Sequence, residues 1–164
     1  MTSPLEEPNT IETHITNWED EIETYISDAE ELAATERESL VKARRGQGKF
    51  RELLLQRESL CRITGVDRPE HLIASHIKPW RSATNSERLD PDNGFMLTPS
   101  VDHLFDKGFI SFDNDGEVLL ADVADRETMK KMGIISCGFS KNIGVLASGQ
   151  KKYLDWHREY LFLA

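Results

Sequence analysis

The stretch from Leu72 to Gly108 reads LIASHIKPWRSATNSERLDPDNGFMLTPSVDHLFDKG, and it decides the fold. Its first six residues are apolar-rich and alternate between two faces, which predicts a strand, and residues 95–97 predict a second strand. Thr98-Pro99 is typical of a helix start and Gly108 of a helix stop. This order predicts an α+β supersecondary unit of strand, strand and helix.

The connection between the two predicted strands is polar. Residues Arg81 to Asp92 predict a long loop, because they combine turn-forming residues with little apolar periodicity. The loop ends at Asn93-Gly94, a pair that favours a turn with positive φ at one of its residues.

Further elements are predicted on both sides of this unit. Residues 109–112 and 117–120 flank Asn114-Asp115-Gly116 and predict an added β-hairpin. A short helix is expected at residues 124–132 and an amphipathic C-terminal helix at residues 153–161. Upstream, Thr35 and Glu38 resemble a capping box and predict the start of a helix. We expect Gly46 and Gly48 to interrupt this helix and residues 50–54 to begin another short helix.

Charge divides the chain into two parts. Residues 1–40 hold twelve acidic residues and one basic residue, a net charge of −11, whereas residues 41–164 hold seventeen acidic and nineteen basic residues, a net charge of +2. We therefore expect an acidic helical extension at residues 1–39 and a main domain at residues 40–164. Within the extension, residues 17–32 predict an amphipathic helix whose acidic face is either a solvated surface or a contact for a partner protein.

The region before and on the first strand is basic. Residues 41–81 carry ten basic and four acidic residues, a net charge of +6, so the acidic whole-chain balance does not exclude a polyanionic substrate. Seven side chains are candidate phosphate contacts: Arg44, Arg45, Lys49, Arg51, Lys78, Arg81 and Arg88. As a group they predict salt-dependent binding of nucleic acid, although each alone is compatible with ordinary surface charge.

Three side chains suggest metal-assisted chemistry. His76 ends the first predicted strand, and a neutral imidazole is suited to accept a proton near neutral pH. Asp102 and Asp106 are one helical turn apart, so a single divalent cation could bridge their carboxylates and remove their repulsion. Mg²⁺ or Mn²⁺ is favoured by oxygen ligands, while Zn²⁺ or Ni²⁺ stays open if an imidazole joins them. A buried histidine and two solvated aspartates would give the same pattern without any site.

These residues together resemble the HNH endonuclease family. The likeness rests on Ala74 to Trp80 (ASHIKPW), Glu87 to Gly94 (ERLDPDNG) and Leu104 to Gly108 (LFDKG), and it is closest to the branch found in bacterial restriction-type enzymes. Weaker similarity upstream and downstream extends it over roughly residues 40–160.

The resemblance implies a ββα-metal core that hydrolyses nucleic-acid phosphodiester bonds. It implies that His76 is the general base, that Asn93 pins the loop between the strands and orients the histidine, and that Asp102 and Asp106 bind the metal. His103 is an alternative ligand to Asp102. Ser75 stands where many relatives have a further ligand, so a catalytically weak nucleic-acid-binding module is the main alternative, and a protein-interaction domain is another.

The expected setting is cytoplasmic. Cys61 and Cys137 are too few for a disulfide framework, and no apolar run is long enough to span a membrane. DNA is the expected substrate, with RNA also compatible, and restriction or defence is the expected role. No motif for reading bases is present, so we expect any sequence specificity to come from a partner or a separate domain.

Overall fold

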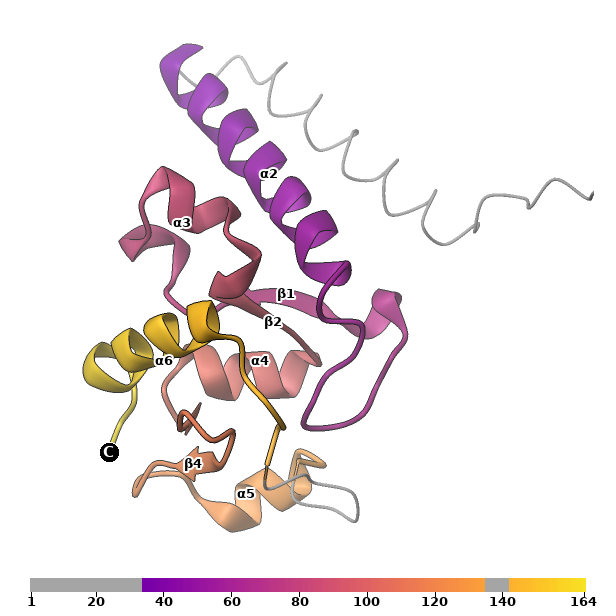
Figure 1. Ribbon diagram of the computed structural model, residues 1–164, viewed down its shortest axis with the longest axis vertical. Helices are drawn as coiled ribbons and strands as arrows, with labels where there is room; N and C mark the ends of the chain where they lie inside the picture. Colours follow the sequence, from indigo (N-terminus) through magenta and orange to yellow (C-terminus); the bar gives the residue numbers. More distant parts are fainter. Residues whose placement is uncertain (1–33, 135–141) are drawn as a thin grey trace, which may run out of the picture. The chain divides into compact units, whose positions relative to one another are not determined.

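The computed structural model describes residues 34–134 and 142–164 (Figure 1). The acidic helix expected at residues 17–32 lies outside the described residues. The chain divides into two compact units, Met1–Gly48 and Lys49–Ala164. The boundary expected between residues 39 and 40 stays a prediction.

The described residues form an α+β fold, as predicted. The α-helices are α2 (Ala34–Leu55), α3 (Asn85–Leu89), α4 (Pro99–Asp106), α5 (Arg126–Lys131) and α6 (Ser148–Tyr160). The strands are β1 (Ile73–His76), β2 (Gly94–Leu97), β3 (Ile110–Phe112) and β4 (Val118–Leu120), and the short 3-10 helices are η1 (Pro69–His71), η2 (Trp80–Ser82) and η3 (Pro91–Asn93). No helix within these described ranges is long and apolar enough to cross a bilayer.

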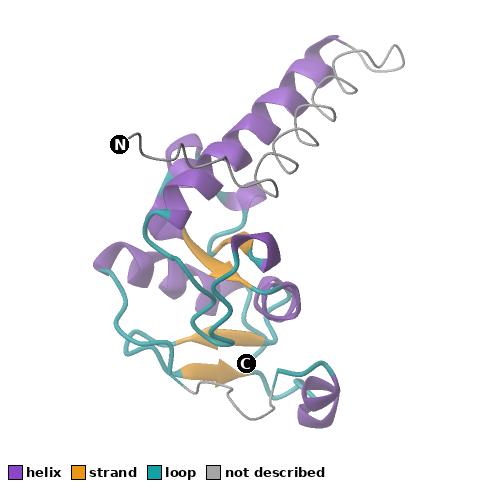
Figure 2. Ribbon diagram, turned by 90° about the vertical axis from the view of Figure 1, so that its right-hand side faces the viewer, coloured by secondary structure: helices purple, strands orange, loops and turns teal. Residues whose placement is uncertain are grey.

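Within residues 34–134 and 142–164, two separate antiparallel pairs of strands form two small sheets (Figure 2). In the first pair, Ile73 lies opposite Leu97 and His76 opposite Gly94. In the second pair, β3 and β4 form the predicted hairpin. Helix α4 packs against β1 and also contacts β3, while α6 packs on η3 and β3. The order β1, β2, α4 therefore follows the predicted strand, strand and helix.

The hydrophobic core draws buried side chains from β2, α4, β3 and α6, among other segments. Every residue of β2 is buried, and so is the apolar stripe of α4, Val101, Leu104 and Phe105. Phe105 stacks on Phe112 of β3 with ring centroids 5.3 Å apart, and Phe95 of β2 meets both rings edge-on. Packing in this core fixes the position of α4 relative to β1. Residues of the two elements can form one site only if this position is fixed.

Helix α2 is continuous, so the predicted interruption at Gly46 and Gly48 is wrong. A glycine in a helix interior costs only about 1 kcal/mol relative to alanine. The neighbouring alanine, arginine, lysine and leucine residues favour helix strongly enough to offset that cost over 22 residues.

The predicted long loop between the strands contains short helices. Residues 80–93 form η2, α3 and η3 in place of irregular backbone. Thr84 and Glu87 form a capping box at the start of α3: the Thr84 hydroxyl accepts from the Glu87 amide at 3.3 Å, and the Glu87 carboxylate accepts from the Thr84 amide at 2.8 Å. The Thr-x-x-Glu spacing was a signal for this helix in the sequence.

His157 of α6 is a fully buried histidine of the core. Its ring lies parallel to the Phe105 ring with centroids 4.0 Å apart. Nε2 lies 2.9 Å from the Phe105 carbonyl, which can only accept, so Nε2 carries the proton and Nδ1 accepts from the Ser111 hydroxyl at 2.9 Å. Burial lowers the pKa of His157 to about 4, and the Phe105 carbonyl only partly opposes this effect.

The stability of the protein should therefore fall as the pH decreases below about 6.5. Between the ordinary histidine pKa of 6.5 and the folded value of about 4, the unfolded chain binds a proton at His157 that the folded protein excludes. Each pH unit in this window removes about 1.4 kcal/mol, to a total of about 3 kcal/mol. Denaturant unfolding from pH 7.5 to 4 measures this slope. Replacing His157 with glutamine should flatten the slope, whereas replacing the exposed His71 with glutamine should not; an equal slope in His157→Gln would contradict the assignment.

Candidate active site

His76 is the last residue of β1, and its ring is held on several sides. The ring stacks on Phe50 with centroids 3.7 Å apart and meets Trp80 edge-on at 5.7 Å. Its Nε2 lies 2.9 Å from the carbonyl oxygen of Arg88. Because a carbonyl only accepts, Nε2 carries the proton in this hydrogen bond, which leaves the lone pair on Nδ1.

The surroundings of His76 favour its neutral form. Burial lowers the pKa of the ring below 6.5, and the nearby Arg88 guanidinium lowers it further, while the Arg88 carbonyl acts in the opposite direction. A neutral imidazole with one nitrogen fixed as a donor presents the other nitrogen as a proton acceptor.

Asn93 is fully buried and ties the ends of the loop together. Its side-chain oxygen accepts from the Lys78 amide at 2.8 Å, and its side-chain nitrogen donates to the carbonyl oxygens of Lys78 and Glu87 at 3.2 and 3.1 Å. Glu87 precedes Arg88, whose carbonyl binds His76. The Asn93 side chain thus connects Lys78 to the residue before Arg88, while its role in catalysis stays a prediction.

Two of the predicted phosphate contacts also hold this loop. Lys78 forms an ion pair with Glu87 at 2.8 Å, and both side chains are about four-fifths buried. Arg88 donates from Nε to the Trp80 carbonyl at 3.0 Å, and its guanidinium lies over the Trp80 ring at 4.8 Å from the centroid. Lys78 and Arg88 are therefore engaged within the protein, and their contact with phosphate stays a prediction.

Gly94 does not form the predicted turn with positive φ. Its φ of −163° is extended, and the residue is the first of β2. Glycine is needed here for space, because a Cβ atom would meet the Phe50 ring at 2.5 Å and the Ser75 carbonyl oxygen at 3.0 Å. Gly94 thus leaves space for the Phe50 ring against the backbone of β2. The same Phe50 ring stacks on His76.

Asp102 of α4 lies against Ser75 of β1. Asp102 is half-buried, and burial raises the pKa of its carboxyl group. The Ser75 hydroxyl donates to Asp102 and opposes this rise, the Asp106 carboxylate adds to it, and His103 opposes it. Asp106 and His103 are exposed. Asp102 and Asp106 are thus close enough to repel each other, as their i, i+4 spacing predicted.

The histidine and the acidic residues lie beside the same strand end but make separate contacts. Ser75 and His76 are consecutive in β1, so their side chains leave the strand on opposite faces. Ser75 contacts Asp102, whereas the hydrogen bond and ring contacts of His76 go to Arg88, Phe50 and Trp80. Within the described part of the chain, the contacts of His76 and the contacts of the α4 carboxylates therefore form two separate clusters.

The residues of α4 fit a hard divalent cation better than a zinc ion. Among the described residues, no three His, Cys, Asp or Glu side chains gather as a metal-binding group. Structural and catalytic zinc sites need at least three protein ligands, whereas Mg²⁺ is commonly held by one or two carboxylates together with water and substrate phosphate. A half-buried carboxylate, Asp102, and an exposed one, Asp106, that repel each other suit the second case.

The remaining basic candidates differ in what they contact. Arg51 donates to the carbonyl oxygens of Leu72 and Pro69, both at 2.7 Å, so it anchors the segment before β1. Lys49 is exposed and pairs with Glu52 at 3.5 Å. Arg81 and Arg45 are exposed, and the side chain of Arg44 lies outside the described residues.

Sequence patterns did not single out several side chains around His76. Phe50 and Arg88 were predicted as a helix residue and a phosphate contact, yet one stacks on the imidazole and the other binds it through its backbone carbonyl. A backbone carbonyl can accept a hydrogen bond whatever the side chain of its residue is. The sequence therefore could not identify Arg88 as the hydrogen-bond acceptor for His76, and only the fold shows it.

One comparison with known proteins found a match. Residues 61–113 match the family model described as HNH endonuclease, a segment that contains β1, β2, α4 and all of the catalytic and metal candidates. No curated protein matches the chain. Enzymes of the HNH family generally use a divalent metal and act on nucleic acid. Residues 61–113 are thus an HNH endonuclease domain, the domain of a phosphodiester hydrolase.

Proposed function

We propose that the protein is a metal-dependent endonuclease that cleaves DNA with a ββα-metal core formed by β1, β2 and α4. The observation that carries the proposal is the state of His76: a neutral imidazole whose Nε2 is fixed on the Arg88 carbonyl and whose Nδ1 keeps its lone pair. In this proposal Nδ1 accepts the proton of the attacking water. Asn93 keeps the imidazole in place through the loop that it ties together.

The scissile phosphate would lie at the end of β1, where His76 is on one face of the strand and Ser75, with the α4 carboxylates, is on the other. Asp102 and Asp106, with His103 as an alternative, would hold the cation, which when bound polarises the phosphate and stabilises the departing 3′ oxygen. Mg²⁺ or Mn²⁺ is favoured, because two carboxylates leave coordination positions for water and phosphate oxygens. Lys49 and Arg81 are exposed and available to contact neighbouring phosphates.

The proposed biological role is restriction of, or defence against, foreign DNA in the cytoplasm. The support for it is the likeness of the ASHIKPW segment, Ala74 to Trp80, to restriction-type enzymes. Residues 1–39 are proposed as a separate acidic extension that meets a partner protein, which would supply the choice of target.

The metal assignment can be tested on α4. Wild-type protein should nick supercoiled plasmid in the presence of Mg²⁺ or Mn²⁺, and a chelator should abolish the activity. Asp102→Asn and Asp106→Asn should each weaken Mn²⁺ binding, followed by electron paramagnetic resonance, by more than about tenfold. Without metal, Asp106→Asn should unfold at the same temperature as wild type or a higher one, because the change removes a repulsion between carboxylates.

The matched control is Asp67→Asn, which removes an exposed carboxylate from the same domain and should leave Mn²⁺ binding unchanged. Unchanged Mn²⁺ affinity in both α4 variants would refute the ligand assignment. Binding of DNA without cleavage under either metal would favour the alternative of a nucleic-acid-binding module, an alternative suggested by Ser75, which stands where many relatives have a further metal ligand.

A further inference from the structure

Helix α6 lies outside the segment that matches the HNH family, yet it contacts the turn that carries Asn93. Its residue Tyr153 is 2 % exposed, and its hydroxyl donates to Oδ2 of Asp90 at 2.7 Å. Burial and the Asp90 carboxylate both raise the pKa of Tyr153 well above its usual range. The hydroxyl therefore remains a donor over the whole range of pH in which a nuclease would be assayed.

Asp90 connects Tyr153 to the turn of Asn93, because it also accepts hydrogen bonds from the residues that follow it. Its other carboxylate oxygen, Oδ1, accepts from the Asp92 amide at 2.9 Å, and its carbonyl oxygen accepts from the Asn93 amide at 2.9 Å. Asp90 thus caps η3 with one oxygen while it is held by α6 with the other. The position of the Asn93 backbone depends on this capped turn.

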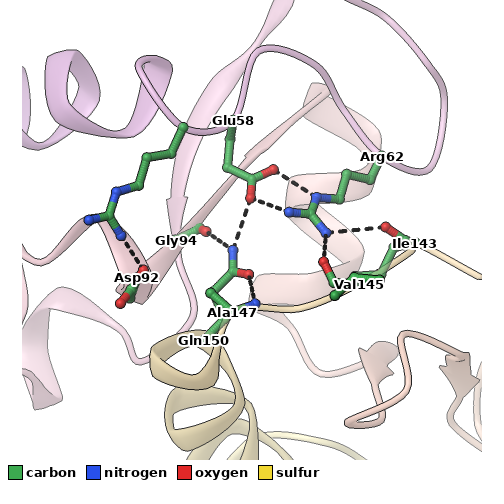
Figure 3. Close-up of polar contacts among 9 residues, drawn as sticks. Glu58, Arg62, Asp92, Gly94, Ile143, Val145, Ala147 and Gln150 are labelled. Atoms are coloured by element: carbon green, nitrogen blue, oxygen red, sulfur yellow. Dashed lines mark hydrogen bonds and ion pairs between the residues drawn. The ribbon is translucent and has the colours of Figure 1, made fainter.

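Helix α6 also holds the residue on the other side of Asn93. The side chain of Gln150 is buried, and its amide nitrogen donates to Glu58 at 3.0 Å and to the Gly94 carbonyl at 3.4 Å (Figure 3). Its amide oxygen accepts from the Ala147 backbone at 3.0 Å, which fixes the orientation of the amide group. Tyr153 and Gln150 are three residues apart on the helix, and they bind residues 90 and 94 on either side of Asn93.

We propose that Tyr153 is a positioning residue for the HNH site: through Asp90 it fixes the turn of Asn93, and Asn93 in turn fixes the loop whose Arg88 carbonyl orients His76. Each link of this relay is a hydrogen bond of 3.1 Å or less. The consequence for catalysis rests on the proposed function, whereas the consequence for the orientation of His76 does not.

Replacing Tyr153 with phenylalanine removes the hydroxyl and keeps the ring in the core. The maximal rate of plasmid nicking should fall about 10-fold to 100-fold, because a small displacement of a catalytic group has an effect of this size. The KM for DNA should change less than twofold, because Tyr153 is buried and does not face the substrate. Tyr160→Phe is the matched control: it removes an exposed hydroxyl from the same helix and should leave both constants unchanged.

The imidazole of His76 gives a second measurement that needs no activity. In wild type, ¹⁵N spectra of the ring should show the tautomer protonated at Nε2. In Tyr153→Phe, the two nitrogen resonances should move towards each other, because the ring is no longer held in one orientation. Both spectra are recorded below the unfolding temperature of each variant, so that a loss of fold is distinguished from a loss of position.

A double-mutant cycle tests whether the effect passes through Asp90. In an Asp90→Ala background, Tyr153→Phe should have little further effect on the rate or the spectrum, because the acceptor of the hydroxyl is already absent. Fully additive effects, or a wild-type His76 spectrum in Tyr153→Phe, would overturn the proposal. A wild-type protein without nuclease activity would refute the proposed function, while the spectra would still decide the role of Tyr153.

Discussion

Replacing His76 with alanine is expected to lower the rate of metal-dependent plasmid cleavage by about 10²-fold to 10⁴-fold, the usual contribution of a general base. The physical reason is the loss of the Nδ1 lone pair, which the hydrogen bond from Nε2 to the Arg88 carbonyl leaves available. DNA binding, measured by fluorescence anisotropy in Ca²⁺, should change little, because the imidazole is half-buried among Phe50, Trp80 and the loop.

The alanine variant also removes a stacked ring, so its folding must be measured separately. His76→Gln keeps a polar side chain of similar length and should show the same loss of rate with a smaller loss of thermal stability. His71→Ala removes an exposed imidazole five residues earlier and should cleave like wild type. If His76→Ala kept a rate within threefold of wild type at the same thermal stability, the assignment of the base would be wrong.

Replacing Arg62 with alanine should destabilise the folded protein by about 3 kcal/mol, because it leaves a buried carboxylate without its cation. Glu58 is 5 % exposed and receives two hydrogen bonds from Arg62, from Nε at 2.8 Å and from Nη2 at 2.5 Å (Figure 3). Nη1 of Arg62 also donates to the carbonyl oxygens of Val145 and Ile143, at 2.8 and 3.3 Å. The arginine thus joins the segment after α2 to the segment before α6.

Urea unfolding at pH 7.5 measures this loss, and two variants serve as comparisons. Arg68→Ala removes an exposed arginine from the same region and should change the free energy of unfolding by less than about 0.5 kcal/mol. Glu58→Leu combined with Arg62→Met removes both charges and should recover part of the stability lost in Arg62→Ala. If Arg62→Ala were as stable as Arg68→Ala, the ion pair between Arg62 and Glu58 would make no net contribution to the free energy of unfolding.

The sequence predicted the elements of the site but not all of its local geometry. His76, Asn93 and the two aspartates of α4 lie on the predicted elements, because strand alternation, helix capping and i, i+4 spacing depend on near neighbours in the chain. The same local rules gave a wrong turn at Gly94, where the need for glycine comes from the Phe50 ring, which lies more than forty residues earlier. They also missed α3, although the Thr84 and Glu87 capping box was readable.

The order of strand, strand and helix, the basic segment before it and the types of the site residues were determined by the sequence alone. Only the tertiary structure decided how those residues are used: Lys78 and Arg88 hold the loop, Ser75 binds Asp102, and a backbone carbonyl orients His76. The physical reason is that periodicity and capping arise between residues a few positions apart. Burial, tautomer and hydrogen-bond partners arise instead from segments that meet only when the chain folds.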